Sequence, residues 1–130
     1  MKVVIKKPGK DFEVIEISKD PVSPYEDSVY RNHLRQYIGV PEYERVELSK
    51  LTNNNLCMFL GEESGLFPER GANIAVKNYV GDMFVGTSII NGPIVFAFAE
   101  RRDDWSISVT EFTDIELLRD IFKFYKFEIL

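Results

Sequence analysis

The sequence is poor in the side chains that metal centres and nucleophilic catalysts require. Its 130 residues include one cysteine, Cys57, and one histidine, His33, which lie far apart along the chain. A disulfide framework needs paired cysteines, and a transition-metal site needs several histidine, cysteine or carboxylate ligands at set spacing. We therefore expect no internal disulfide, no metal site of this kind and no cofactor.

Cys57 and His33 are also weak candidates for a catalytic pair. Cys57 falls in the apolar run 56–60, where a buried thiol behaves as a small apolar group. His33 falls one residue from the apolar stripe of a predicted helix, between Arg31 and Arg35, so we expect a partly buried structural histidine. We name no catalytic residue and expect binding rather than catalysis, although the sequence leaves enzymatic activity open.

Long apolar runs and charge of one sign are missing as well. No stretch approaches the roughly 20 apolar residues of a membrane span, and the amino terminus has no basic stretch followed by an apolar core. Acidic residues outnumber basic ones 21 to 16, so a concentrated positive face for nucleic acid is not predicted. The amino-terminal lysines are better explained as a charged strand edge. We expect no membrane partner and disfavour nucleic acid, and the single cysteine favours a cytoplasmic location.

Short strands are predicted along most of the chain. The β-branched stretches 2–7 and 12–17 flank Pro8 and Gly9, which predicts an opening hairpin. Alternating or continuous apolar residues predict further strands. These are expected around 46–48, 56–60, 83–90, 94–99 and 105–110. Asn91 and Gly92 predict a hairpin turn between the 83–90 and 94–99 strands.

Two helices are predicted at 24–38 and from about residue 115 onward. Ser23 and Glu26 form a capping box before the first helix, and Gly39 ends it. Thr113 and Glu116 form a second capping box. Residues 1–130 should thus form a single α+β domain, with an antiparallel or mixed sheet of about five to seven strands and two helices packed on one face.

The stretch 61–81 is the least regular part of the chain, because it holds four glycines and Pro68. We expect a long loop with a short helical turn or a stub of strand near 74–76, and loops of this length are often functional. The candidate binding residues are Arg70 and Asn73 in this loop and Lys10 in the first hairpin turn.

The last residues, 124–130, are strongly apolar. They should either pack back on the domain or form a contact between subunits, so the protein is expected to be a monomer or a homodimer formed through this tail.

Four stretches carry a resemblance to a known family: 3–10 with its Pro-Gly-Lys, 34–48, 66–73 and 84–90 with its Val-Gly-Thr. In this order of features the chain resembles a family of small domains of unknown function found in bacteriophages, prophages and mobile elements. The resemblance implies an accessory role in phage or mobile-element biology and brings no activity with it.

Three functions are compatible with the sequence. The preferred one is a non-enzymatic interaction domain that binds a host or phage protein. The first alternative is a small-molecule or nucleotide-binding or processing domain that uses the 61–81 loop, its carboxylates and Asn73. The second is weak nucleic-acid binding through the amino-terminal lysines.

Overall fold

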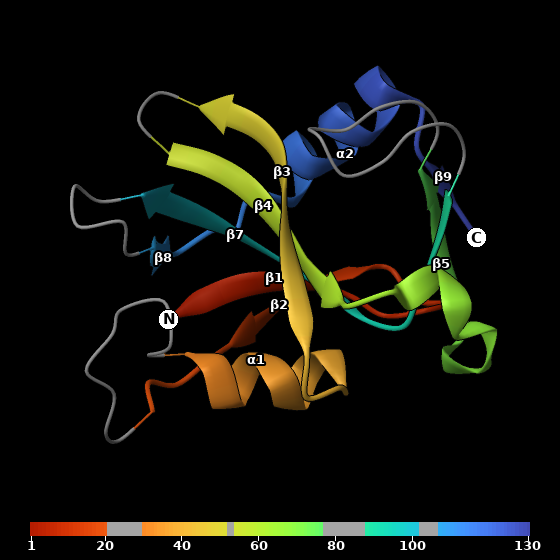
Figure 1. Cartoon of the computed structure of the whole chain (residues 1–130). Coiled ribbons are helices and arrows are strands. Elements are labelled where there is room, and N and C mark those ends of the chain that lie inside the picture. The colour runs from red at the N-terminus through yellow and green to blue at the C-terminus, as the bar shows by residue number, and fades with distance from the viewer. Residues whose placement is uncertain (21–29, 52–53, 77–87, 102–106) are drawn as a thin grey trace.

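The structure is a computed structural model, and it describes residues 1–20, 30–51, 54–76, 88–101 and 107–130 (Figure 1). Parts of three predicted elements fall outside these ranges. They are the capping box at Ser23 and Glu26, the first part of the 83–90 strand, and Trp105 at the start of the 105–110 strand.

The larger sheet has six strands in the order β2-β1-β7-β4-β3, and β8 also pairs with β7. Its strands are β1 (Lys2–Lys6), β2 (Phe12–Glu16), β3 (Tyr43–Leu51), β4 (Asn54–Gly61), β7 (Ile94–Arg101) and β8 (Ile107–Thr110). Every pairing in it is antiparallel. β7 is central, and its consecutive residues Ile94, Val95, Phe96 and Ala97 are all fully buried because both faces of the sheet are covered.

The smaller sheet has three strands, in the order β6-β5-β9. They are β5 (Ala72–Val76), β6 (Ser88–Asn91) and β9 (Glu128–Ile129), and their pairings are antiparallel. Figure 1 shows this sheet standing beside the larger one at the end where β1 and β2 meet. Two turns of 3-10 helix, η2 (Ser64–Leu66) and η3 (Pro68–Arg70), precede β5. A long loop with a short helical turn or a stub of strand near 74–76 was expected here, and the structure has both features, with the strand running over Ala72–Val76. Residues 77–81 of the predicted loop lie outside the described ranges.

The opening hairpin is also as predicted. β1 and β2 pair in register, with Val4 opposite Val14. Gly9 in the turn has a φ of +71°, which a residue without Cβ adopts at little cost.

The hairpin predicted at Asn91 and Gly92 is wrong. β6 pairs with β5, whereas β7 pairs with β1, β4 and β8, so the chain passes from one sheet to the other between Asn91 and Ile94. Gly92, at a φ of +82°, donates its N–H to the carbonyl of Gly71 rather than closing a hairpin. Pro93 has no N–H to donate to a ladder, which favours this change of sheet.

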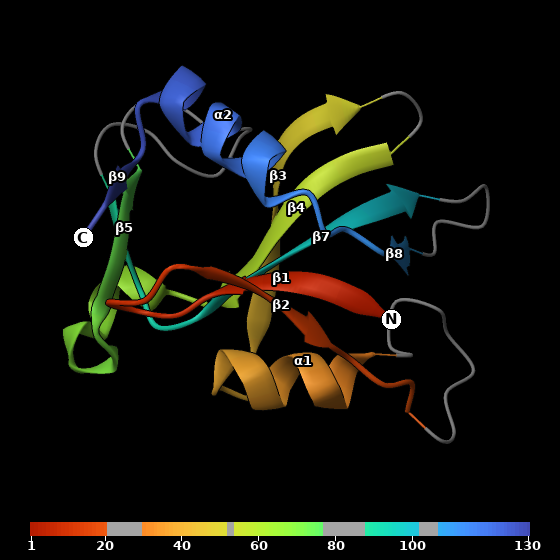
Figure 2. The same cartoon turned by 180° about the vertical axis from the view of Figure 1, so that it is seen from behind.

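The α+β class and the antiparallel sheet are confirmed, but the two helices do not share a face. Helix α1 (Arg31–Ile38) buries Leu34 and Ile38 in the same cluster as Val3. Helix α2 (Ile115–Tyr125) buries Leu118 in the cluster that holds Val4. Because adjacent residues of a strand point to opposite faces, α1 and α2 cover opposite faces of the larger sheet (Figure 2). The expectation of one helical layer is therefore corrected.

The start predicted for the first helix, at residue 24, lies outside the described residues. Within them α1 begins at Arg31, because Tyr30 has a non-helical backbone with φ −108° and ψ 8°. Gly39, with φ +87°, ends it as expected. In α2 the cap is Asp114 rather than Thr113, since the Asp114 carboxylate accepts the N–H of Leu117 at 3.0 Å.

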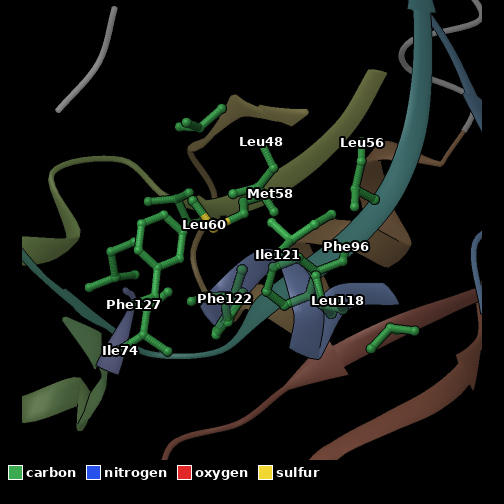
Figure 3. Close-up of a cluster of buried hydrophobic side chains, with 14 of the residues drawn as sticks. Leu48, Leu56, Met58, Leu60, Ile74, Phe96, Leu118, Ile121, Phe122 and Phe127 are labelled. Atoms are coloured by element: carbon green, nitrogen blue, oxygen red, sulfur yellow. The ribbon is translucent and has the colours of Figure 1, made fainter. Parts of the chain in front are cut away.

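The main core lies between the larger sheet, α2 and the smaller sheet (Figure 3). Met58 and Phe96 from the larger sheet, Phe122 from α2 and Ile74 from the smaller sheet belong to it. The apolar tail packs into this core through Phe127, which is 9% exposed, and β9 pairs with β5. The tail thus packs on its own domain, whereas a homodimer formed through it stays a prediction.

Candidate functional site

The three binding residues predicted from the sequence lie in different surroundings. Lys10 is exposed in the turn between β1 and β2. Arg70 is half-buried at the end of η3, and Asn73 is fully buried in β5. The structure brings Arg70 and Asn73 to the same region, because both approach Gly92, but Lys10 does not join them in any contact described here.

Asn73 forms a buried polar pair with Lys6. It is the extra residue of a β-bulge, since Ala72 and Ile74 pair with the adjacent residues Asn91 and Ile90. Its Oδ1 accepts from Lys6 Nζ at 2.9 Å, and its Nδ2 donates to the carbonyls of Lys6 at 2.7 Å and Gly92 at 2.9 Å. The Asn73 amide is therefore satisfied within the fold.

Lys6 is fully buried, although it carries an ammonium group. Burial lowers its pKa, and the negative charge of Asp11 partly opposes that change. Lys6 Nζ also donates to the carbonyl of Lys7 at 3.0 Å. These two acceptors offset part of the cost of removing the group from water.

Arg70 joins α1 to the turn after β6. Its Nη2 donates to the carbonyl of Ile38, 2.6 Å away, at the negative end of α1. The guanidinium packs so closely against Gly61 and Gly92 that a Cβ at either position would collide with it. Nη1 is buried and has no hydrogen-bond partner among the described residues. Whether Arg70 or Asn73 also contacts a ligand stays a prediction.

The candidate site that the structure adds is a groove of about 650 Å³ beside α2 and β9, which we call the C-terminal groove. Its lining combines three aromatic rings with three cations. The rings are Phe12, Phe122 and Phe127, and the cations are Arg119, Lys123 and Lys126. Aromatic floors with a few charged groups at the edge are typical of binding sites.

The aromatic floor is rigidly packed. The ring centroids of Phe12 and Phe122 are 5.3 Å apart, as are those of Phe122 and Phe127, and both pairs meet edge to face. Figure 3 shows Phe122 and Phe127 within the core, next to Ile74. Tyr125, stacked on Phe127 with centroids 5.5 Å apart, donates its hydroxyl to the carbonyl of Leu48 at 2.9 Å. These contacts hold the end of α2 against β3.

Two of the cations come from α2 and the third from the residue that ends it. Arg119 and Lys123 are four residues apart, so they lie along one side of the helix, and Lys126 follows as the C-cap. Lys123 and Lys126 are exposed. Lys126 has left-handed backbone angles, with φ +57° and ψ +39°, and its N–H donates to carbonyls at the end of the helix. The chain therefore turns sharply at Lys126 and returns along β5 as β9.

Arg119 is the anchored member of the three. Its Nη2 lies 2.9 Å from Asp11 Oδ2 and 3.1 Å from Asp11 Oδ1, and its guanidinium carbon sits 5.5 Å from the centre of the Phe12 ring. The hydrogen bond to Arg119 lowers the pKa of the Asp11 carboxyl, and Asp11 raises the pKa of Arg119. This exposed pair ties the first hairpin to α2.

Three apolar side chains of the tail are left in solvent. Phe124 is 79% exposed, Ile129 50% and Leu130 42%. Ile129 lines the groove, so its exposed side chain adds an apolar contact to this surface. The apolar tail was predicted from the sequence, but the three cations were not; their spacing of four and three residues was the pattern that could have revealed them.

The two reactive residues of the chain are kept apart from this groove. Cys57 is buried in β4, and burial raises the pKa of its thiol to about 12. His33 Nδ1 accepts the N–H of Ser18, and its ring contacts Tyr37 with centroids 4.9 Å apart. Both are therefore held by the fold as expected. In the described ranges, no three potential metal ligands of the His, Cys, Asp or Glu type lie close enough to hold an ion.

No protein-family model, no curated protein and no solved structure matches this chain. Within the described residues, neither α1 nor α2 has the length and apolar character that a membrane crossing demands.

Proposed function

We propose that this protein is a non-enzymatic protein-binding domain whose C-terminal groove holds an acidic partner segment with one large apolar side chain. The observation that supports this most is the combination of three cations above an aromatic floor in one groove. The apolar side chain would enter between the rings, and the carboxylates would meet Lys123 and Lys126.

A protein segment fits this groove better than nucleic acid does. The chain carries a formal charge of −5, so the basic edge is local and a long phosphate backbone would meet repulsion beyond it. Glu128 also lines the groove, and Asp11 already neutralises Arg119. A short segment with a few carboxylates can use the local cations and avoid the acidic surroundings.

We also propose a setting for this binding. The resemblance to small domains of phages, prophages and mobile elements supports an accessory role in such an element, with a host or phage protein as the partner. A bacterial cytoplasmic location agrees with a chain whose sole cysteine, Cys57, is a buried free thiol.

Fluorescence polarisation with three labelled synthetic peptides tests the proposal. The first has aspartates and glutamates around one central phenylalanine, the second has asparagine and glutamine in their place, and the third has glycine in place of the phenylalanine. We expect saturable binding of the first and affinities lower by at least about tenfold for the others. No binding of the first peptide, or equal binding of all three, would contradict the proposal.

Two matched charge reversals test the location. Lys123→Glu should weaken binding of the first peptide by about tenfold or more. Lys2→Glu makes the same change at an exposed lysine of β1 that does not line the groove, and affinity should stay within about twofold. Equal losses in the two variants, or tighter binding of a single-stranded oligonucleotide than of the peptide, would count against this site.

A further inference from the structure

A second cavity, of about 150 Å³, lies on the opposite face of the larger sheet, beside α1. Three arginines line it together with apolar and aromatic side chains, namely Arg31, Arg35, Arg45, Tyr43, Phe59 and Val109. Phe59 and Val109 belong to the buried cluster beneath α1, so the floor is apolar. Neither the predicted binding residues nor the C-terminal groove contributes to this lining.

The fold brings the three arginines together from two elements. Arg31 and Arg35 are one helical turn apart in α1, so both point to the same side of the helix. Arg45 alternates with the buried Val46 in β3, which puts it on the sheet face that α1 covers. Glu42, in the connection from α1 to β3, is an acidic neighbour in the lining. The three positive charges of the arginines therefore outnumber the one negative charge in the lining.

Within the described part of the chain, the charges of the three arginines are not neutralised by an ion pair. Over the ranges that the structure describes, none of the three forms an ion pair within 4.0 Å. Arg35 Nε is buried and has no hydrogen-bond partner among these residues. A buried N–H of a charged group that stays unpaired is costly, so such a group favours an anionic oxygen as its partner.

We propose that this cavity binds the phosphate group of a small ligand. A guanidinium presents paired N–H donors that match two oxygens of a phosphate, and up to three such groups can meet a dianion from different sides. The volume is below the usual range of about 300 to 1,000 Å³ for whole-ligand pockets. The phosphate group therefore enters the cavity while the remainder of the ligand lies outside. This site is independent of the C-terminal groove, because the sheet separates them.

Nuclear magnetic resonance with the intact protein tests the proposal directly. The side-chain Nε–Hε resonance of Arg35 is followed while inorganic phosphate, glycerol phosphate or acetate is added at constant ionic strength. We expect a saturable shift with inorganic phosphate or glycerol phosphate and a small, non-saturating one with acetate. The phosphate that binds more tightly identifies the source as free phosphate or a phosphate ester. Saturation by neither, or equal responses to all three, would overturn the proposal.

Variants measured by titration calorimetry supply the second test. Arg35→Lys keeps the charge but loses the paired donors, and affinity should fall about tenfold. Arg45→Gln should give a similar loss and serves as the test if Arg35→Lys does not fold. Lys2→Gln removes a positive charge from the other side of the sheet and should change affinity by less than about twofold. If phosphate affinity falls equally in Lys2→Gln, the site is not the cavity.

Discussion

Lys6 and Asn73 hydrogen-bond each other twice, side chain to side chain and side chain to backbone, and both residues are fully buried. Lys6 ends β1 in the larger sheet, and Asn73 sits in β5 of the smaller one. The Asn73 carbonyl also accepts the N–H of Leu130, 3.0 Å away. This pair therefore links the two sheets and the strand that borders the C-terminal groove.

Asn73→Ala should lower the free energy of unfolding by at least about 2 kcal/mol. The change removes one of the two acceptors of Lys6 Nζ and the donor of two buried carbonyls, and each carbonyl left unpaired costs roughly 1–3 kcal/mol. Asn55→Ala is the matched control, since the Asn55 side chain bonds Glu47 at an exposed position, and it should stay within about 0.5 kcal/mol. Urea denaturation measures both values. Similar losses would show that the buried pair contributes little.

Gly92→Ala should be more destabilising than Gly9→Ala. Both glycines have a positive φ, +82° and +71°, so each substitution costs about 1–2 kcal/mol in backbone conformation. A Cβ at Gly92 would also come within 2.6 Å of the Arg70 guanidinium, whereas nothing lies within 4 Å of one at Gly9. We expect a difference of at least about 1 kcal/mol in the free energy of unfolding. Equal costs would mean that Arg70 moves aside freely.

Lys126→Gly should stabilise the protein by about 0.5–1 kcal/mol. Lys126 ends α2 in the left-handed conformation, which glycine adopts without the Cβ penalty. Lys123→Gly, placed inside the last turn of the same helix, should instead destabilise by about 1 kcal/mol because glycine is a poor helix former. Thermal unfolding of the two variants, with opposite shifts in midpoint, checks this prediction. A loss of stability in Lys126→Gly would contradict it.

Glu44→Gln should stabilise the protein near neutral pH. Burial, with added repulsion from Glu62 and Glu63, raises the pKa of Glu44 above its ordinary value of 4.5. Between pH 4.5 and the raised pKa of Glu44, the folded state holds a proton that the unfolded chain has already lost. The free energy of unfolding therefore falls as pH rises through this window. A glutamine has no negative charge, so it avoids both the burial of a carboxylate and the repulsion from Glu62 and Glu63.

The gain from Glu44→Gln should therefore disappear as pH drops below the ordinary carboxyl pKa, where both states are protonated. Denaturation curves at several pH values measure it. Glu69→Gln, at an exposed position of η3, is the control and should change stability little at any pH. A gain that persists in acid would argue against this cause.

Local patterns of the sequence predicted the elements that short-range physics controls. The first hairpin follows from two β-branched stretches around Pro8 and Gly9, and the end of α1 follows from Gly39. β3, with Val46 and Leu48 buried, and the apolar run in β4 were equally readable, because alternation and burial leave a direct trace in the order of residues.

Tertiary structure decided what depends on contacts between distant segments. Asn91 and Gly92 have the local chemistry of a hairpin turn, but β6 pairs with β5 and β7 with β4, partners that lie far away along the chain and that local turn chemistry does not specify. The sequence shows that each helix has one apolar side, but not which face of the sheet that side covers. In the folded chain α1 packs in the cluster of Val3 and α2 in the cluster of Val4, and these neighbouring residues of β1 point to opposite faces. The grouping of Arg119 with Phe12, and of Arg35 with Arg45, arises only when the chain is folded, since each pair joins residues of different elements.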